Sequence, residues 1–524
     1  MVQLRLIRLA GGRSFFITGF RKAMNFRCVS RPFPRMHAGN RRKMQLSGNQ
    51  VQMQISTPMS LDCELIIIGA GAAGLFAACE AADAGIPAVL VERRHRPGLK
   101  LLMCGNNRCN LSHAGSAADL LRDYGSPVAD FLAPAVNAFP PSALGRRMAQ
   151  LGVSTKLIGS RVYPESERGD DVLHAFTDHL RDAEMPVIYN CPVRRIVRED
   201  GKFVLECGGI RLSAPRVILA TGGCSYPKTG SAGDGYRFAE ELGLAVEEPR
   251  AGLVGVELEA DHPLCRLEVP SAEVSDITAT APGMPTFRGN LLVENGCLRG
   301  KAVFDLTRWA ARHRQEIREV TLDLLPERTA AQIRRNAAAA PNGRPATALN
   351  AAGMPPMLAA ALAEIPGMTP EMLKSLHLAP VQCRPLKEAI VTVGGIALSE
   401  IDSRTMEARN LPGFHVVGEA LDVDGPTGGY NLHAAFATAR AAVAAIAAQC
   451  GNEKPAPKRE DERRQNGRPR RENDRKPNAP QHRNDAPKNG QLKTRRDNNA
   501  WGKGIWEGRT IRRDAPKKSS GREG

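Results

Sequence analysis

The sequence lacks two features that would assign it to a class at once. It contains no run of about 18 apolar residues, so it offers no candidate for a membrane-spanning helix. Its twelve cysteines form no Cys-x-x-Cys pair, so we predict no metal site. Several of them, such as Cys63 and Cys79, lie within apolar runs, which is typical of free thiols in a reducing compartment. We therefore predict a soluble cytoplasmic protein whose 42% hydrophobic residues can bury one large core or two smaller ones.

Acidic residues are missing from residues 1–50, which carry 11 Lys and Arg. Residues 452–524 hold 22 basic and 11 acidic residues, so the two ends carry more than the whole net charge of +17. Residues 51–451 hold 39 basic and 44 acidic residues and are slightly acidic. The basic charge is therefore no argument that the folded body binds nucleic acid.

Both basic ends are predicted to lie outside the folded body. Residues 1–58 are Arg-rich like an organellar transit peptide. However, Met44, Met53 and Met59 all precede the first clear strand, and we favour a disordered leader or an over-long start. Residues 452–524 have almost no aliphatic side chains and are predicted to be disordered. Trp501 and Trp506 stand among basic residues there, a pattern that suits weak binding of nucleic acid or another anionic partner; a solvated tail is the simpler interpretation.

Between the ends, strand and helix patterns alternate. Residues 65–68 form an apolar run, an Ala-rich helix follows over 72–84, Gly85 stops it, and 88–91 form a second strand. This is a βαβ opening. The same patterns predict strands at 216–220 and 414–417 and a last helix at 432–449.

The alternation breaks in the middle of the chain. Strand-like pieces punctuated by Gly and Pro give way to helical pieces at 329–336 and 357–364. We therefore predict a domain at 250–383 that is inserted between the two parts, 60–249 and 384–451, of one α/β domain.

The strongest chemical signal is the motif Gly69-Ala70-Gly71-Ala72-Ala73-Gly74, which joins the strand at 65–68 to the Ala-rich helix. Gly69 permits a tight turn, Gly71 lets the backbone approach a pyrophosphate, and Gly74 allows close packing of helix on strand. The N-terminus of the helix then faces the phosphates. Glu92 follows Gly69 by 23 residues, where a carboxylate can accept both hydroxyls of an adenosine ribose. The pattern predicts a dinucleotide site.

The rest of the chain favours FAD over NAD as the dinucleotide. Thr221-Gly222-Gly223 ends one strand in a small turn, and Gly418-Glu419 ends another. The loop Gly428-Gly429-Tyr430-Asn431 then opens the last helix, whose N-terminal dipole suits the negative charge of a reduced flavin. An extended FAD needs such a second terminus, with Glu419 on a ribityl hydroxyl and the amides at 429–432 on the flavin pyrimidine edge; NAD alone does not.

Four segments together resemble the YhiN/BaiN-type flavoproteins, which are also called aminoacetone oxidase family or NAD(P)/FAD-dependent oxidoreductases. These segments are CGNNRCNLSH (104–113), ATGGCSYPKTGSAGDGYRFAEELG (220–243), VTVGGIALSEID (391–402) and VVGEALDVDGPTGGYNLHAAFATARAA (416–442). The resemblance spans about 62–449. It implies an α/β fold with a two-part Rossmann-like FAD-binding domain of the glutathione reductase type, interrupted by an insert that contains a β-barrel and a helical piece.

The resemblance also implies cofactor-binding positions. The ADP half would be held by Gly69, Ala70, Gly71, Ala73, Gly74 and Glu92, and the rest of the cofactor by Lys100, Arg108, Cys109, Asn110, Thr221, Gly222, Gly223, Gly418, Glu419, Asp422, Gly429, Asn431 and Leu432. The chain departs from the family where Cys104, Asn106 and Asn107 replace glycines and a serine. Residues 295–306 also replace the usual Gly-Leu-Ser-Gly-Pro stretch of the insert.

Cys104 and Cys109 form a Cys-x4-Cys pair that is similar to the redox dithiol of flavin disulfide reductases. Those enzymes also need a second GxGxxG motif for NADPH and a C-terminal His-Glu pair, and this sequence has neither. We therefore favour an ordinary thiol in a flavin loop over a working disulfide.

We therefore predict an FAD-dependent oxidoreductase that transfers a hydride to or from a small or hydrophobic organic substrate, with NADH or NADPH as the candidate donor. Acids or bases for this chemistry must lie over the flavin ring. The candidates are Tyr226, Lys228, Tyr430, His433 and Arg108, and from these we select Tyr226, Tyr430 and His433 as catalytic residues. The loop Gly233-Asp234-Gly235 also resembles that of fumarate-reductase-like flavoproteins, which reduce activated alkenes. Two alternatives stay open: an RNA-associated flavoprotein that uses its basic tail, and a flavin-binding protein without turnover.

Overall fold

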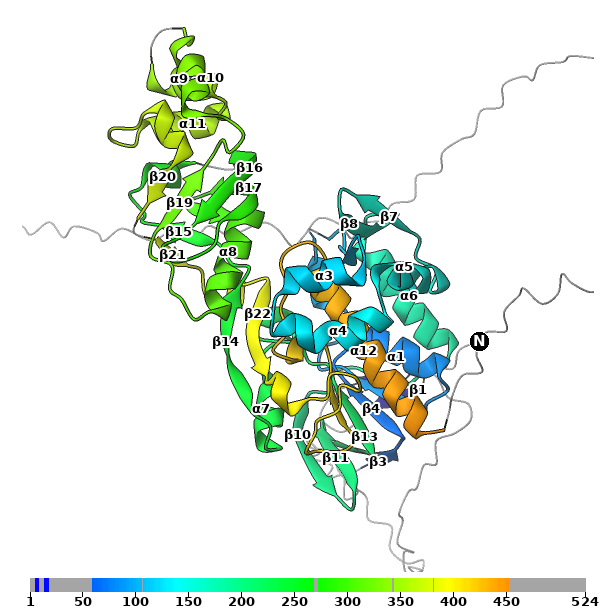
Figure 1. The fold of residues 1–524 in the computed structure, drawn as a ribbon. Coiled ribbons are helices and arrows are strands. Elements are labelled where there is room, and N and C mark those ends of the chain that lie inside the picture. The colour runs from blue at the N-terminus through cyan, green and yellow to red at the C-terminus, as the bar shows by residue number, and fades with distance from the viewer. Residues whose placement is uncertain are drawn as a thin grey trace, which may run out of the picture. The chain divides into compact units, whose positions relative to one another are not determined.

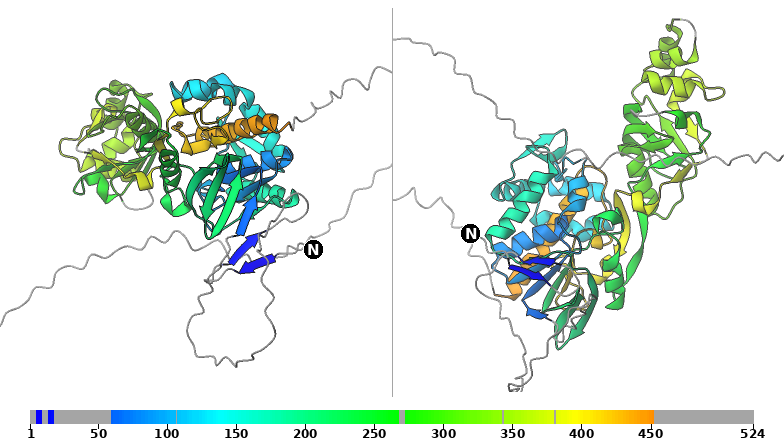
Figure 2. Two further views of the ribbon diagram at one scale, coloured as in Figure 1. Left: turned by 90° about the horizontal axis from the view of Figure 1, so that it is seen from below. Right: turned by 180° about the vertical axis from the view of Figure 1, so that it is seen from behind.

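The computed structural model describes residues 5–8, 14–17, 59–105, 107–267, 272–341, 344–379 and 381–451. The predictions for residues 452–524, Trp501 and Trp506 included, lie outside the described residues, as does most of the predicted leader. Within that leader, β1 (Arg5–Arg8) and β2 (Ser14–Ile17) pair antiparallel (Figure 2).

A five-stranded parallel sheet forms the centre of the α/β domain. Its order is β23 (Phe414–Val416), β13 (Arg216–Leu219), β4 (Leu65–Ile68), β5 (Ala88–Val91) and β9 (Val187–Ile188). The runs LIII and AVLV are buried along their whole length, as strands covered on both faces must be. β23 comes from the second part of the domain and pairs with β13 from the first, so one sheet unites the two parts.

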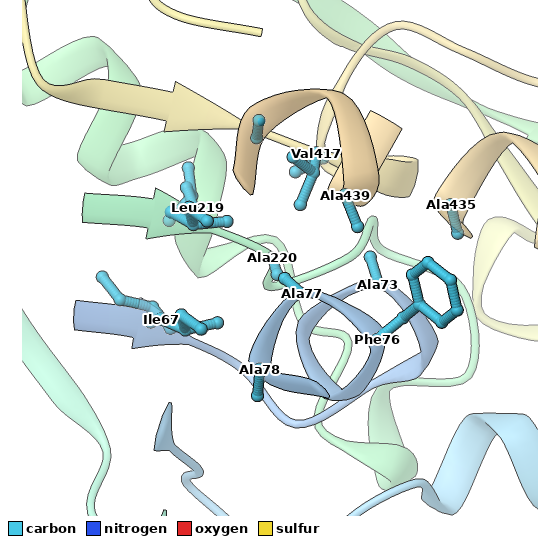
Figure 3. Close-up of a cluster of buried hydrophobic side chains, with 14 of the residues drawn as sticks. Ile67, Ala73, Phe76, Ala77, Ala78, Leu219, Ala220, Val417, Ala435 and Ala439 are labelled. Carbon is cyan, nitrogen blue, oxygen red and sulfur yellow. The ribbon is translucent and has the colours of Figure 1, made fainter. Parts of the chain in front are cut away.

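Helices α1 (Ala72–Asp83) and α12 (Tyr430–Gln449) pack against each other beside this sheet (Figure 3). Ala73 and Ala77 of α1 lie near Ala435 and Ala439 of α12, and such small side chains let the two helices approach closely. Phe76 of α1 fills the remaining space, with its ring centroid 5.0 Å from that of Phe436. Among the described residues, no helix combines the length and the hydropathy that a bilayer crossing requires.

The remaining elements of the α/β domain surround this core (Figure 1). A four-stranded sheet has the order β10 (Val193–Glu199), β11 (Lys202–Cys207), β12 (Ile210–Ala214) and β3 (Met59–Asp62). A three-stranded sheet has the order β6 (Ser112–His113), β8 (Arg161–Pro164) and β7 (Thr155–Ile158). The other helices are α2 (Leu99–Met103), α3 (Ala117–Tyr124), α4 (Val128–Ala138), α5 (Pro141–Gln150), α6 (Gly169–Asp182) and α7 (Asp234–Glu241).

A two-stranded antiparallel ribbon, β14 (Val246–Gly252) and β22 (Val391–Ile396), leads to and from the insert (Figure 1). The insert has its own hydrophobic core. Its sheet has the order β20 (Leu376–Leu378), β19 (Val320–Asp323), β16 (Ala272–Thr280), β17 (Phe287–Glu294), β18 (Cys297–Arg299), β15 (Val256–Leu258) and β21 (Val381–Cys383). Its helices are α8 (Lys301–Arg312), α9 (Ala330–Ala338), α10 (Pro345–Ala352) and α11 (Pro356–Ala363).

The described residues do not show the β-barrel that the family resemblance implied for the insert. Among the described residues, no strand pairing joins its edge strands β20 and β21, so the hydrogen-bonded order is open. Only residues 379 and 380 separate the two strands in sequence, which holds their facing ends within about 11 Å. Val381 N also donates to Arg318 O beside β19 (2.9 Å). The two edge strands therefore lie close together in sequence, but the described residues show no pairing between them.

Candidate functional site

A cavity of about 530 Å³ lies at the carboxyl ends of four of the parallel strands. Its walls include Ile68 and Gly69 after β4, Glu92 after β5, Thr221 after β13 and Glu419 after β23. The carboxyl edge of such a sheet is where open α/β folds bind their ligands. Segments separated by more than 300 positions therefore share one cavity.

The glycines of the first turn have distinct steric roles. Gly69 has φ +99°, and a Cβ on it would stand 2.6 Å from Ala220 O. A Cβ on Gly74 would stand 1.8 Å from Gly69 O, so only glycine lets α1 pack this closely on its turn. A Cβ on Gly71 would meet no atom within 4 Å, because Gly71 faces the cavity. This is the geometry expected where a backbone must approach a ligand.

Two helices begin at the cavity without side-chain caps. Gly71 precedes α1 and Gly429, with φ +98°, precedes α12, and neither helix has a side-chain cap hydrogen bond. The first helical hydrogen bonds are donated by Leu75 N and His433 N, so earlier amides keep free N–H groups. Ala72 and Ala73 in α1 and Asn431 and Leu432 in α12 carry such amides, and all four line the cavity. Both helix dipoles therefore favour a ligand with negative charge.

Glu92 is fixed at the cavity wall by two backbone amides. Its Oε2 accepts from Ala70 N (2.8 Å) and its Oε1 from Arg94 N (2.7 Å). Each carboxylate oxygen keeps a second lone pair, which suits two ribose hydroxyls. Burial raises the pKa of Glu92, while the two amides oppose that rise.

Glu419 and Lys100 form an ion pair in the cavity wall, so their charges neutralise each other. Glu419 Oε1 accepts from Thr392 N (2.9 Å) and Ser225 Oγ (3.1 Å), and Oε2 accepts from Lys100 Nζ. A Cβ on Gly223 would stand 2.4 Å from Thr392 Oγ1, so Gly223 makes room for this cluster from behind the wall.

Several buried polar atoms at the cavity have no hydrogen-bond partner within the described residues. They are Asn110 Oδ1, Thr221 Oγ1, Thr427 Oγ1 and Arg108 Nε. Unpaired buried polar atoms are costly, and a ligand rich in hydroxyl, phosphate and amide groups would satisfy them. The residues present therefore fit FAD.

Fifteen of the predicted cofactor residues line the cavity. They are Gly69, Ala70, Gly71, Ala73, Glu92, Lys100, Arg108, Asn110, Thr221, Gly222, Gly418, Glu419, Gly429, Asn431 and Leu432. The structure places Gly74, Cys109, Gly223 and Asp422 behind the wall. Asp422 instead accepts from Arg312 Nη1 (2.7 Å) and Gly394 N (2.9 Å), so it contacts the insert.

Of the three residues selected as catalytic, only Tyr226 lines the cavity, and Arg108 among the other candidates lines it as well. The Tyr226 backbone has φ +51°, a left-handed conformation that is uncommon for a tyrosine and marks a constrained position. Burial raises the pKa of its hydroxyl, so Tyr226 keeps its proton at neutral pH.

Tyr430 and His433 lie outside the cavity wall, in structural contacts. The Tyr430 hydroxyl donates to Asp123, and its ring stacks on His113 with centroids 4.9 Å apart. His433 is fully buried, with Nδ1 2.9 Å from Ser112 Oγ and Nε2 3.0 Å from Phe139 O. Burial lowers the pKa of His433 to about 4, so the ring is neutral at pH 7.

Cys104 lines the cavity and Cys109 is buried behind it, and both are free thiols. Burial raises the pKa of Cys104 to about 11 and raises that of Cys109 as well. A redox dithiol needs a thiolate that forms near neutral pH. This environment argues against the disulfide reductase interpretation.

The sequence did not point to several residues of the wall. Arg93, Arg96 and Arg161 bring cationic side chains to the cavity, and Thr427 adds a buried hydroxyl. Arg93 and Arg96 could have been found from their closeness to Glu92, and Thr427 from its place beside Gly428. Arg161 sits in the hairpin of β7 and β8, which no motif marks.

Comparisons with known proteins agree with this fold. The model of the HI0933-like protein Rossmann domain matches residues 63–445. A ribosomal RNA dihydrouridine synthase of Escherichia coli (strain K12) is 30% identical over 398 residues, which cover 72% of this chain and 96% of that protein. A 3-dehydro-bile acid delta(4,6)-reductase of Clostridium scindens is 28% identical over 399 residues, which cover 71% and 96%.

A solved 3-ketosteroid-delta4-(5alpha)-dehydrogenase from Rhodococcus jostii aligns with 76% of this chain and 99% of its own, at 14% identity and a TM-score of 0.43. The family model covers most of the chain, and so does the alignment with the Escherichia coli protein. The chain belongs to the HI0933-like family and is an FAD-dependent oxidoreductase.

Proposed function

We propose that the protein reduces a carbon–carbon double bond that is conjugated to a carbonyl group. The names of both curated relatives describe this chemistry: formation of dihydrouridine saturates C5=C6 beside the C4 carbonyl, and a bile acid delta(4,6)-reductase acts on double bonds conjugated to a 3-keto group. One observation carries the proposal for this chain. A single cavity contains both the predicted dinucleotide-binding residues at the carboxyl ends of the parallel strands and a protonated tyrosine, Tyr226.

The cofactor in this proposal is FAD. Glu92 would accept the adenosine ribose hydroxyls, the free amides of Ala72 and Ala73 would face the pyrophosphate, and those of Asn431 and Leu432 the flavin pyrimidine edge. When bound and reduced by NADH or NADPH, FAD supplies the hydride that adds to the β-carbon of the double bond.

Tyr226 would supply the proton that completes the reduction at the α-carbon. Its raised pKa keeps the hydroxyl protonated until negative charge develops on the substrate carbonyl. Its left-handed backbone conformation, with φ +51°, restricts the direction in which the Cβ leaves the chain. The atoms then balance, because one hydride and one proton convert C=C into CH–CH.

A uridine within RNA is the substrate class that we favour. The cavity is lined by Arg93, Arg96, Arg108 and Arg161, and guanidinium groups suit the phosphates that flank a nucleobase. A small hydrophobic enone is the second candidate, because Met103, Leu253, Ile390 and Val423 give the same cavity apolar walls.

The test is to purify the full chain with FAD, reduce it anaerobically with NADH or NADPH, and offer it unmodified ribosomal RNA or a 3-keto-4-ene steroid. Mass spectrometry of the digested RNA reports the gain of two hydrogens per uridine, and loss of the enone absorbance reports reduction of the steroid. Tyr226→Phe should lower turnover about 100-fold or more while FAD binding persists. If reduced protein leaves both substrates unchanged, the proposal is wrong; reduction of the steroid alone would select the second candidate.

A further inference from the structure

Helix α8 of the insert presents three charged residues on one face. Asp305, Arg308 and Arg312 are spaced i, i+3 and i+7, which aligns them along one side of a helix. None of them lines the cavity. All three instead bind the loop over 422–427, which carries Val423, Pro426 and Thr427 to the cavity wall.

The Arg308 side chain binds both the side chain and the backbone carbonyl of Asp424 in the loop. Its Nε donates to Asp424 Oδ2 (2.6 Å), and its Nη2 donates to Asp424 O (3.0 Å). The same Nη2 also donates to Tyr124 O (3.0 Å), which is the last residue of α3. Arg308 thus joins the insert, the loop and α3 at one point.

Arg312 adds a second pair of contacts one turn further along α8. Its Nη1 donates to Asp422 Oδ1 (2.7 Å), and its Nη2 donates to Asp424 Oδ1. The Asp424 side chain is wholly buried, so its charge depends on the two arginines. Loss of either arginine would leave part of this buried charge without its partner.

Asp305, the third charged residue of this face of α8, binds the other end of the loop. Its Oδ1 accepts from Thr427 N (3.2 Å), and Lys301 pairs with its Oδ2. Thr427 precedes the Gly428-Gly429 turn that opens α12, and its own hydroxyl is among the unpaired atoms at the cavity. The contacts of α8 with the loop therefore reach the residues that directly precede the N-terminus of α12.

We infer that α8 is a positioning helix for the cofactor: Asp305, Arg308 and Arg312 hold residues 422–429 in the conformation that receives the flavin end of FAD. The inference rests on the proposed cofactor site, and it makes the insert a determinant of FAD affinity through residues that do not touch FAD. Holding the loop in place before binding removes the cost of ordering it.

The first test compares FAD affinity in matched variants of the full chain. Apoprotein of wild type, Arg308→Gln, Arg312→Gln and Arg314→Gln is titrated with FAD while flavin fluorescence is followed. We expect the dissociation constant to rise about tenfold or more in the first two variants. Arg314→Gln is the control, because Arg314 follows α8, pairs with the exposed Glu247 and, among the described residues, forms no hydrogen bond or ion pair with residues 422–427; its dissociation constant should stay within about twofold of wild type.

Two further readouts separate positioning from folding. Arg312→Lys keeps the positive charge but loses the two guanidinium donors that bind Asp422 and Asp424 together. Its FAD dissociation constant should therefore lie between those of wild type and Arg312→Gln. In wild-type apoprotein, FAD should slow amide hydrogen exchange in residues 301–312, although α8 lies outside the cavity. This exchange measurement decides the question even if the arginine variants fail to fold.

The outcomes separate the two proposals. Wild-type protein that takes up no FAD would overturn the proposed function. Wild-type protein that binds FAD while exchange in α8 is unchanged, or folded arginine variants with unaltered FAD affinity, would overturn the positioning role and leave the proposed function intact.

Discussion

His433 shows how burial fixes the chemistry of a single residue. Its position on the first turn of α12 made it a candidate acid in the sequence, but its ring nitrogens are taken up by Ser112 and Phe139. Such a ring cannot exchange protons with a substrate without opening the core. The sequence could place His433 on the right helix, but a position in a sequence does not say which way a side chain faces.

The buried neutral ring predicts a pH-dependent stability. The pKa of His433 is lowered from 6.5 to about 4, so below pH 6.5 the unfolded chain binds a proton that the folded chain does not bind. Stability should therefore be lost as pH falls from about 6.5 to about 4, by about 3 kcal/mol at most. Urea unfolding of apoprotein at a series of pH values measures this loss.

The control for this prediction is His433→Gln. The glutamine amide can still donate to Phe139 O and accept from Ser112, but it does not become protonated in this pH range. The loss of stability between pH 6.5 and 4 should be smaller in this variant than in wild type by about the same amount. If the unfolding free energy fell equally steeply with pH in the two proteins, the pH dependence could not be assigned to His433.

At the scale of elements, the sequence predicted best where local patterns decide. The runs at 65–68 and 88–91 are strands with those bounds, because four consecutive buried apolar residues between turn residues have few alternatives. The last helix begins at Tyr430 rather than at 432, since Gly429 in a left-handed conformation already starts it. Residues 329–336 and 357–364 lie within one or two positions of α9 and α11.

Pairings over long distances were harder to predict. The ribbon of β14 and β22 joins residues about 140 positions apart, and no local pattern encodes their register. The contact of α8 with residues 422–427 was missed for the same reason, although Arg308, Arg312, Asp422 and Asp424 are all visible in the sequence. Gly69, Ala70, Gly71 and Ala73 line the cavity because the glycine motif fixes its own local geometry, whereas Lys100, Arg108 and Asn110 could be predicted only from the resemblance to a family.

Two glycines of the first turn provide a matched pair of element-scale variants. Gly74→Ala places a methyl group 1.8 Å from Gly69 O, so α1 must move off its strand. We expect a loss of about 1–3 kcal/mol in unfolding free energy together with weaker FAD binding. Gly71→Ala meets no atom within 4 Å, so it should leave the unfolding free energy nearly unchanged.

In Gly71→Ala the new methyl group enters the cavity, so FAD affinity alone should fall, by about tenfold. Thermal unfolding of the apoproteins and fluorescence titration with FAD separate the two effects. A Gly71→Ala protein that binds FAD like wild type would show that no phosphate group approaches this turn.

At the scale of the whole molecule, charge and cofactor site belong to different parts of the sequence. Every residue that lines the cavity lies between positions 68 and 435. The basic excess lies in residues 1–50 and 452–524. Flavin chemistry and any retention of a polyanion can therefore be tested separately with one truncation.

Deletion of residues 452–524 removes 22 basic and 11 acidic residues, which lowers the net charge from +17 to +6. The FAD dissociation constant should not change, because the deletion touches no cavity residue. Affinity for ribosomal RNA should fall, and the slope of log K against log salt should become shallower by about 0.7 for each phosphate contact that is lost.

Filter binding of labelled RNA at several salt concentrations, with the flavin spectrum as the control for folding, measures both quantities. An unchanged salt slope in a protein that lacks both residues 452–524 and the basic residues 1–50 would mean that RNA is held by the arginines of the cavity wall. In that case Arg96→Gln and Arg161→Gln in that protein should lower the slope instead, because both side chains line the cavity from separate elements.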